Sequence, residues 1–244
     1  MEYVKQSKVE RALHVDPNDE EHIWLTKQDT LRIFVGVLGM LLPVLLYVFL
    51  RLDTGYKSPL ESISHYYNTR VSSILVITVS LLAIFLIIYK GKSRLDFILS
   101  LIAGISALCV VLFPTSSFSK ICPDPKWPYS VTILHESPGR VCFHYINAAI
   151  FLLSLAFMSL FQFTQSDIPV KKDRPKGKRT RNFIYSVMGI LMVLAVSVIG
   201  GSMVFDLIPE PGYTENHITF WMEVIALECF GISWLVKSGI IIKD

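Results

Sequence analysis

Six long apolar runs separated by polar connectors dominate the pattern of this chain, and each run is 18 to 23 residues long. At a rise of about 1.5 Å per residue, a helix of that length crosses a hydrocarbon layer about 30 Å thick. We therefore expect an all-α, polytopic membrane protein with six transmembrane helices. The predicted spans are residues 33–50, 71–89, 95–113, 143–163, 183–205 and 218–236.

The composition agrees with this class and leaves little room for a second domain. Apolar residues make up 52% of the chain and charged residues 18%, and the mean hydropathy is +0.50, which is untypical of a soluble domain. The largest polar segments are too short and too polar to bury a core of their own. We expect a cytoplasmic N-terminal segment (1–32), a six-helix transmembrane domain (33–236) and a cytoplasmic tail (237–244).

The distribution of basic residues predicts the orientation. The connectors 90–94 and 164–182 hold ten lysines and arginines, whereas the other three loops, 51–70, 114–142 and 206–217, hold six. Short basic connectors stay on the cytoplasmic side, so both termini should face the cytoplasm. The chain has no Asn-x-Ser/Thr acceptor, which favours a cell inner (plasma) membrane. We expect anionic membrane lipids as partners, and no nucleic acid.

Cysteine positions fit the same topology. Cys122 and Cys142 lie at the two ends of the longest predicted outward loop, where an oxidising compartment would let a disulfide persist. Spacing alone does not establish the geometry of a bridge, so two free thiols are the alternative.

Two carboxylates fall inside the last apolar run, Glu223 and Glu228. Ionisable residues are costly in hydrocarbon and commonly face a cavity or a partner. Five residues apart, they differ by about 140° around a helix and do not share a face. One hypothesis is that they line a proton or cation path, and the alternative is that each is neutral and hydrogen-bonded to an adjacent helix.

A second group of polar residues should gather at the outer membrane surface. Histidine and carboxylate side chains at this density can hold zinc, with His65 and His144 as candidate ligands, but no His-Glu-x-x-His or Cys-x-x-Cys pair accompanies them. Histidine and tyrosine are also ordinary interfacial residues. The candidate residues are Glu61, Ser62, Ser64, His65, Tyr66, Tyr67 and His144.

Several short stretches resemble a group of uncharacterised bacterial six-helix membrane proteins. They are Ser-Ile-Ser-His-Tyr-Tyr at 62–67, Leu-Phe-Pro-Thr at 112–115, His144, Phe-Trp-Met-Glu at 220–223 and Phe-Gly-Ile-Ser-Trp at 230–234. More remotely, the helix pattern is similar to that of the FRAG1/DRAM/Sfk1-like membrane proteins. The closer resemblance implies a single site near the outer leaflet, and Glu228 is not part of its pattern. That site would comprise Ser62, Ser64, Tyr66, Tyr67, His144 and Glu223.

The sequence leaves two main functions open, and a structural or sensory protein without turnover is a third alternative. The first is a homo-oligomeric channel or transporter in which Glu223 and Glu228 form an ion path. The second is a membrane-embedded hydrolase or lipid-binding protein in which His65, His144 and Glu223 act at the outer leaflet. No nucleotide-binding glycine pattern is present, and beyond the possible zinc we expect no cofactor.

Overall fold

The computed structural model describes residues 28–116, 137–166, 168 and 173–242, and this part of the chain is helical and contains no β-strand. Six long helices account for most of it, with one short 3₁₀ helix, one turn of π-helix and one short α-helix between them. In chain order the elements are α2 (Gln28–Thr54), η2 (Ile63–Asn68), α3 (Ser72–Ile88), α4 (Arg94–Leu112), α5 (Pro138–Phe157), η4 (Met158–Gln162), α6 (Lys176–Phe205), α7 (Gly212–Glu215) and α8 (Ile218–Lys237).

Five of these helices are long and apolar enough to cross a membrane, namely α2, α4, α5 with η4, α6 and α8. The sixth, α3, is equally apolar but has 17 residues. Three helices begin well before the predicted spans, α2 at Gln28, α5 at Pro138 and α6 at Lys176. Hydropathy marks only the apolar part of a helix, whereas the backbone hydrogen bonds continue through the polar residues that precede it.

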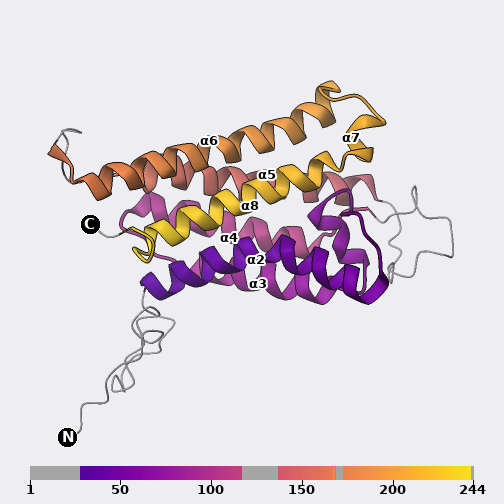
Figure 1. The fold of residues 1–244 in the computed structure, drawn as a ribbon, viewed down its shortest axis with the longest axis horizontal. Coiled ribbons are helices and arrows are strands. Elements are labelled where there is room, and N and C mark those ends of the chain that lie inside the picture. The colour runs from indigo at the N-terminus through magenta and orange to yellow at the C-terminus, as the bar shows by residue number, and fades with distance from the viewer. Residues whose placement is uncertain (1–27, 117–136, 167, 169–172, 243–244) are drawn as a thin grey trace, which may run out of the picture.

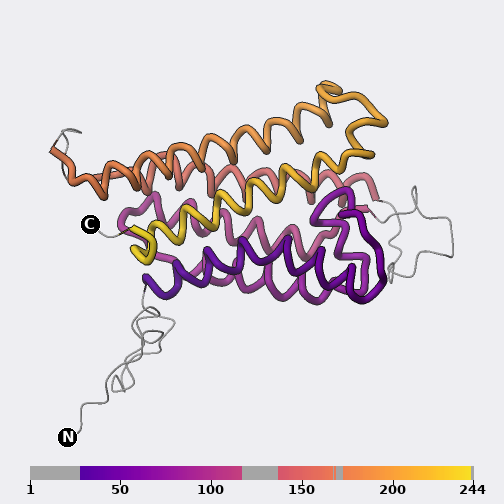
Figure 2. The backbone as a smooth tube through the Cα atoms, viewed as in Figure 1, coloured from indigo at the N-terminus to yellow at the C-terminus, as the bar shows by residue number. Residues whose placement is uncertain are grey.

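The long helices form a closed ring (Figures 1 and 2). Each helix from α2 to α6 packs against the next in chain order, and α8 packs against both α6 and α2. The start of α2 and the end of α8 lie at one end of the bundle, called here the inner end. The segments η2 and α7 lie at the opposite, outer end. Side chains that belong to distant parts of the sequence therefore meet inside the ring.

Glycines let two pairs of helices touch backbone to backbone. A Cβ atom on Gly36 of α2 would lie 2.9 Å from the carbonyl oxygen of Gly231 of α8, and a Cβ on Gly231 would lie 2.7 Å from that of Gly36. A Cβ on Gly104 of α4 would lie 2.7 Å from the carbonyl oxygen of Ala83 of α3. Small residues are the usual means of close helix approach in lipid. Gly39 of α2 also faces α8, where an added Cβ would lie 2.8 Å from the ring of Phe230.

The glycines of α6 differ from one another in their contacts. Gly189 faces the end of α5 and η4, where an added Cβ would lie 3.2 Å from the carbonyl oxygen of Ala156 and 2.4 Å from a side-chain carbon of Leu160. A Cβ on Gly200 would meet no atom of the described chain within 4 Å, and one on Gly201 would meet only Leu207, which follows α6. Gly200 and Gly201 therefore make no close contact between helices.

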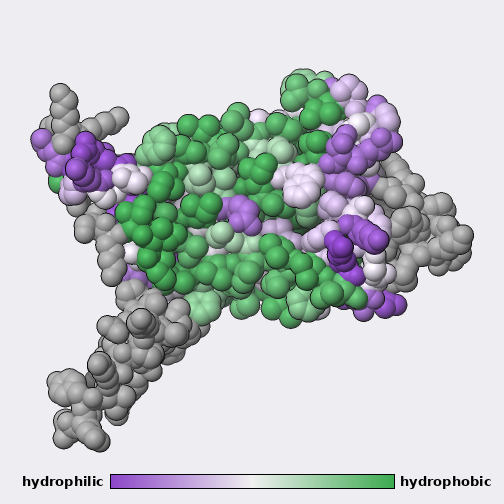
Figure 3. Space-filling model, viewed as in Figure 1, coloured by the Kyte–Doolittle hydropathy of each residue, from purple (hydrophilic) through white to green (hydrophobic). Residues whose placement is uncertain are grey.

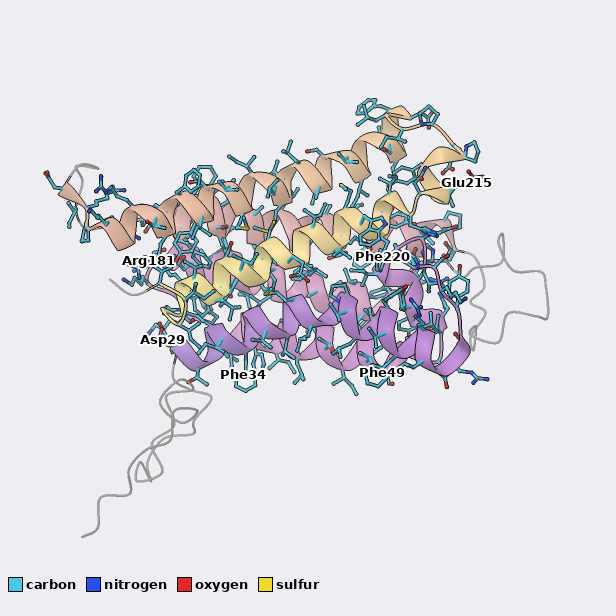
Figure 4. The ribbon with its side chains drawn as sticks, in the orientation of Figure 1. Asp29, Phe34, Phe49, Arg181, Glu215 and Phe220 are labelled. Atoms are coloured by element: carbon cyan, nitrogen blue, oxygen red, sulfur yellow. The ribbon has the colours of Figure 1, made fainter. Side chains whose placement is uncertain are left out.

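The outer surface of the ring is apolar. Figure 3 shows a hydrophobic band between two hydrophilic ends, and large side chains such as Ile77, Ile146 and Leu194 are more than half exposed on it. Charged residues lie at the ends, with Asp29 and Arg181 at the inner end and Glu215 at the outer end (Figure 4). An exposed apolar surface of this extent is typical of a protein embedded in a membrane.

Candidate functional site

The segment between α2 and α3 forms a compact cap at the outer end of the bundle. Ser62 begins the 3₁₀ helix η2, its hydroxyl oxygen accepting a hydrogen bond from the backbone N–H of His65 at 3.3 Å. The same oxygen lies 2.9 Å from Nδ1 of His65. At the other end of η2, the Thr69 hydroxyl donates to the carbonyl oxygen of Tyr66 at 2.7 Å. These local bonds hold the Ser-Ile-Ser-His-Tyr-Tyr stretch in one conformation.

Two hydrogen bonds join this cap to α8. The carboxylate oxygen Oε2 of Glu223 accepts a hydrogen bond from the backbone N–H of Ile63 at 2.6 Å. The backbone N–H of Phe220, which has no partner within its own helix, donates to the carbonyl oxygen of Glu61 at 2.9 Å. The first turn of α8 and the first turn of η2 are thereby held together.

His144 of α5 reaches across to the C-terminal end of α4. Its Nδ1 lies 2.9 Å from the carbonyl oxygen of Phe113 and 3.2 Å from that of Val110, so one N–H is shared between two acceptors. Pro114 has no backbone N–H, so the Val110 carbonyl lacks the helical partner it would otherwise have four residues on. Carbonyl oxygens only accept hydrogen bonds, and we therefore assign the ring proton to Nδ1.

The other ring nitrogen of His144 contacts η2. Its Nε2 lies 2.9 Å from the hydroxyl oxygen of Ser64. With the proton on Nδ1, Nε2 of the neutral ring is an acceptor, so the Ser64 hydroxyl donates to it. His144 is only 2% exposed, whereas Ser64 remains half-buried. The histidine thus links three elements, α5, α4 and η2, through hydrogen bonds at both nitrogens.

A pocket lies inside the ring directly beneath this link. It encloses about 690 Å³ of space between atoms, a volume that includes open solvent at its mouth. Its polar residues are Ser64, Tyr67, His144 and Glu223. The remaining lining residues are apolar and belong to α2, α3, α4, α5, α8 and the segments at the outer end: Leu42, Ile63, Leu75, Val79, Leu82, Val110, Val111, Pro114, Ala148, Phe151, Leu152 and Leu227.

The pocket extends from the outer end toward the middle of the bundle. Along α3 its wall runs from Leu75 to Leu82, a distance of about 10 Å at 1.5 Å per residue. Its four polar side chains come from η2, from the first turns of α5 and from the first turns of α8. The result is a narrow apolar pocket with hydrogen-bonding groups at one end.

The sequence-predicted outer residues divide into two groups. Ser64, Tyr67, His144 and Glu223 converge on the pocket, whereas Glu61, Ser62, His65 and Tyr66 do not line it. The second group supports the cap instead. Tyr66 is fully buried, with its ring 6.2 Å from that of Phe220, and its hydroxyl oxygen lies 3.4 Å from the backbone N–H of Leu60, which donates to it.

Burial shifts the ionisation of the cap residues. It lowers the pKa of His65 to about 4, and the electrostatic interaction with the neighbouring His144 side chain makes a smaller contribution in the same direction. Burial raises the pKa of the Glu61 carboxyl, and the neighbouring negative charge of Glu210 raises it further. The His65 side chain is therefore neutral at physiological pH.

The two carboxylates of α8 lie in different surroundings. Glu223 is at the polar end of the pocket, whereas Glu228 does not line it. Glu228 is half-buried, and no residue in the described part of the chain forms a hydrogen bond or ion pair with it. The pocket thus contains one of the two acids of the predicted ion path. The path itself stays a prediction.

No candidate metal centre emerges from the described residues. Within them, no three histidine, cysteine, aspartate or glutamate side chains are placed to hold a metal ion together. Both nitrogens of His144 are engaged, with Ser64 on one side and two carbonyl oxygens on the other. Zinc binding by His65 and His144 therefore gains no support from this geometry.

The predicted disulfide falls partly outside the described residues. Cys142 is exposed near the start of α5, and Cys122 lies in the segment that the structure does not describe. The bridge between them stays a prediction.

Sequence reasoning did not identify the carbonyl groups that orient His144. Backbone oxygens have no side-chain signature, and the one available signal was Pro114, which removes a helical donor just after α4. The apolar walls of the pocket also have no sequence signature, because the same residue types face the lipid.

Neither a protein-family model nor any curated protein or solved structure matches the chain.

Proposed function

We propose that this protein is an integral membrane protein that binds an acyl lipid, with the hydrocarbon chain in the pocket inside the ring. The polar group of the lipid would meet Ser64, Tyr67, His144 and Glu223. The observation that carries this proposal is the segregation within the pocket, whose walls are apolar and whose hydrogen-bonding side chains all gather at one end. An amphiphile with one chain and one polar group has the same division.

The position of the pocket supports a lipid over a water-soluble ligand. It lies among helices whose outer faces are apolar, so its ligand would come from the bilayer in which these helices sit. Its lining residues extend along α3 from Leu75 to Leu82, and an acyl chain in a bilayer runs in the same general direction as membrane-spanning helices. Leu42, Val79 and Leu82 would contact the chain through dispersion and hydrophobic burial.

The proposal includes six membrane spans with both termini in the cytoplasm of a cell with a plasma (inner) membrane. The 17-residue helix α3 is about 26 Å long, near the thickness of a hydrocarbon core, and local thinning of the bilayer accommodates the difference. The basic residues of the 90–94 connector and of the start of α6 then lie inside. In this orientation the polar end of the pocket is at the outer leaflet.

Photochemical capture of a lipid tests the proposal. The purified chain is reconstituted in vesicles with trace palmitic acid bearing a mid-chain diazirine, irradiated, and the adduct is quantified by intact mass. Leu152→Trp should fill the pocket, since Leu152 lines it and is 8% exposed. The indole would occupy space that the acyl chain needs, and a loss of about 1 kcal/mol or more of binding free energy lowers the capture about fivefold or more.

The matched control is the next residue along α5. Leu153 is 42% exposed and does not line the pocket, so Leu153→Trp should capture palmitic acid as the wild type does. Adducts on pocket residues that disappear only in Leu152→Trp support the proposal. Equal capture by both variants, with adducts spread over the outer faces of the ring, would refute it.

A further inference from the structure

Ser64 and His144 share a geometry that is used for nucleophilic catalysis. A serine becomes a nucleophile when a neighbouring base takes its proton and when a third group holds that base in the correct orientation. Here the Ser64 hydroxyl donates to Nε2 of His144 at 2.9 Å, and the proton on Nδ1 is held by two carbonyl oxygens. The base, its tautomer and the nucleophile are all determined by these three contacts.

In many serine–histidine sites a carboxylate stabilises the protonated histidine, and here the C-terminal end of α4 takes that role. When His144 accepts a proton, a positive charge forms on a buried ring. The carbonyls of Val110 and Phe113 lie at the C-terminal end of α4, where the aligned peptide dipoles amount to about half a negative charge. That partial charge stabilises the imidazolium without moving, because both carbonyls are already hydrogen-bonded to Nδ1.

The surroundings place the hydroxyl against the ligand. Ser64 and His144 both line the polar end of the pocket, and the rest of its wall is apolar. Glu223 holds the backbone of Ile63, the residue before Ser64, through the 2.6 Å hydrogen bond described above. Glu223 is therefore a positioning residue, since it fixes the segment that carries the nucleophile.

We infer that Ser64 is the nucleophile and His144 the general base of an acyl-transfer site that acts on acyl esters. This inference rests on the proposed acyl-lipid pocket and names the chemistry performed at its polar end. Ser64 Oγ forms a bond to the ester carbonyl carbon while its proton passes to Nε2 of His144. The bond from that carbon to the alcohol oxygen breaks, and the alcohol leaves with the proton from Nε2.

The acyl group is then attached to Ser64, and water completes the cycle. His144 takes a proton from the water as its oxygen attacks the acyl carbon. The bond to Ser64 Oγ breaks, Ser64 recovers its proton from Nε2, and a fatty acid is released. The products are one alcohol and one carboxylic acid for each ester and water consumed, and no oxidant or reductant is needed.

A serine-directed phosphonylating probe tests this inference in the full-length chain. An alkyl fluorophosphonate bearing a fluorophore reacts only with an activated serine, which displaces fluoride and gains a stable adduct. The wild type in nanodiscs should be labelled once, and peptide mapping should place the adduct on Ser64. Ser64→Ala should remove the label, while Ser73→Ala, which changes an exposed serine at the start of α3, should leave labelling unchanged.

His144→Gln separates the base from a structural role. Glutamine can keep hydrogen bonds in both directions but cannot accept the proton, so labelling should slow about 100-fold or more. Thermal unfolding in the same nanodiscs reports whether the fold persists. A folded His144→Gln variant labelled at the wild-type rate would overturn the inference.

The failure of this inference is distinguishable from that of the proposed function. Wild-type protein that captures the photoreactive palmitic acid in its pocket, but gains no adduct on Ser64, would overturn the acyl-transfer site and leave lipid binding standing. Wild-type protein that does neither would overturn both.

Discussion

Replacing Gly231 by alanine should destabilise the bundle, although alanine is the better helix former. The exchange favours the helix by about 1 kcal/mol on propensity alone. Against this, the new Cβ would lie 2.7 Å from the carbonyl oxygen of Gly36 and 2.2 Å from a side-chain carbon of Met40. Met40 can change its rotamer, but the Gly36 carbonyl belongs to the backbone of α2 and moves only if α2 and α8 separate.

The size of the effect follows from these opposing contributions. Overpacking of a tight contact costs typically about 1–3 kcal/mol, and separation of the helices also weakens the neighbouring contact of Gly39 with Phe230. A net loss of about 1–2 kcal/mol is expected, which lowers the melting temperature by roughly 2–8 °C for a chain of this size. Thermal unfolding in detergent, followed by tryptophan fluorescence and by size-exclusion chromatography, measures this shift.

Gly200→Ala is the matched control, because it makes the same chemical change in a helix with open space beside it. A Cβ there meets no atom of the described chain within 4 Å, so only the propensity gain of up to about 1 kcal/mol remains. The two variants should therefore shift the melting temperature in opposite directions. If Gly231→Ala were as stable as wild type, the reasoning from backbone contact would be refuted.

Three further predictions follow from the cap, from α8 and from the cysteines. Because burial lowers the pKa of His65 to about 4 from an ordinary value of 6.5, the unfolded chain binds its proton first. The free energy of unfolding should therefore fall by up to about 3 kcal/mol as the pH drops from about 6.5 to about 4. In His65→Asn, a plot of melting temperature against pH should be flatter over this range. An unchanged slope in the variant would contradict the burial argument. The ion-path hypothesis predicts that Glu223→Gln or Glu228→Gln lowers proton flux into liposomes, and wild-type flux in both variants would count against it. A thiol-specific label should reach Cys122 and Cys142 only after reduction, whereas labelling of both without reductant would exclude the disulfide.

Much of the helical organisation was predictable because a membrane restricts what a chain can do. Apolar runs in hydrocarbon must satisfy their backbone groups internally, so runs of about 20 residues become helices wherever they fall. The contacts of Gly36 and Gly104 were predictable for a similar reason, since small residues are the main way for helices in lipid to approach closely. The same reasoning missed Gly189 and Gly231, because sequence does not say which face of a helix meets a neighbour.

The candidate site was predictable as a set of residues but not as a geometry. Successive connectors lie at opposite ends of the bundle, which places η2, the start of α5 and the start of α8 at the same end. The topology alone therefore groups Ser64, His144 and Glu223. The separation of Glu223 from Glu228 also follows from their 140° offset on one helix. Which of the grouped residues reach the pocket depends on the ring closure of α8 against α2, and no local pattern encodes that contact.

By itself, the sequence determined that this protein is helical, that its helices are apolar enough for a membrane, and which polar side chains share its outer end. Those properties depend on composition and periodicity, which act locally along the chain. Only the tertiary structure decided that His144 meets the carbonyls of Val110 and Phe113 on one side and Ser64 on the other. Such contacts join backbone and side-chain groups from three separate elements, and their partners are chosen by the packing of whole helices.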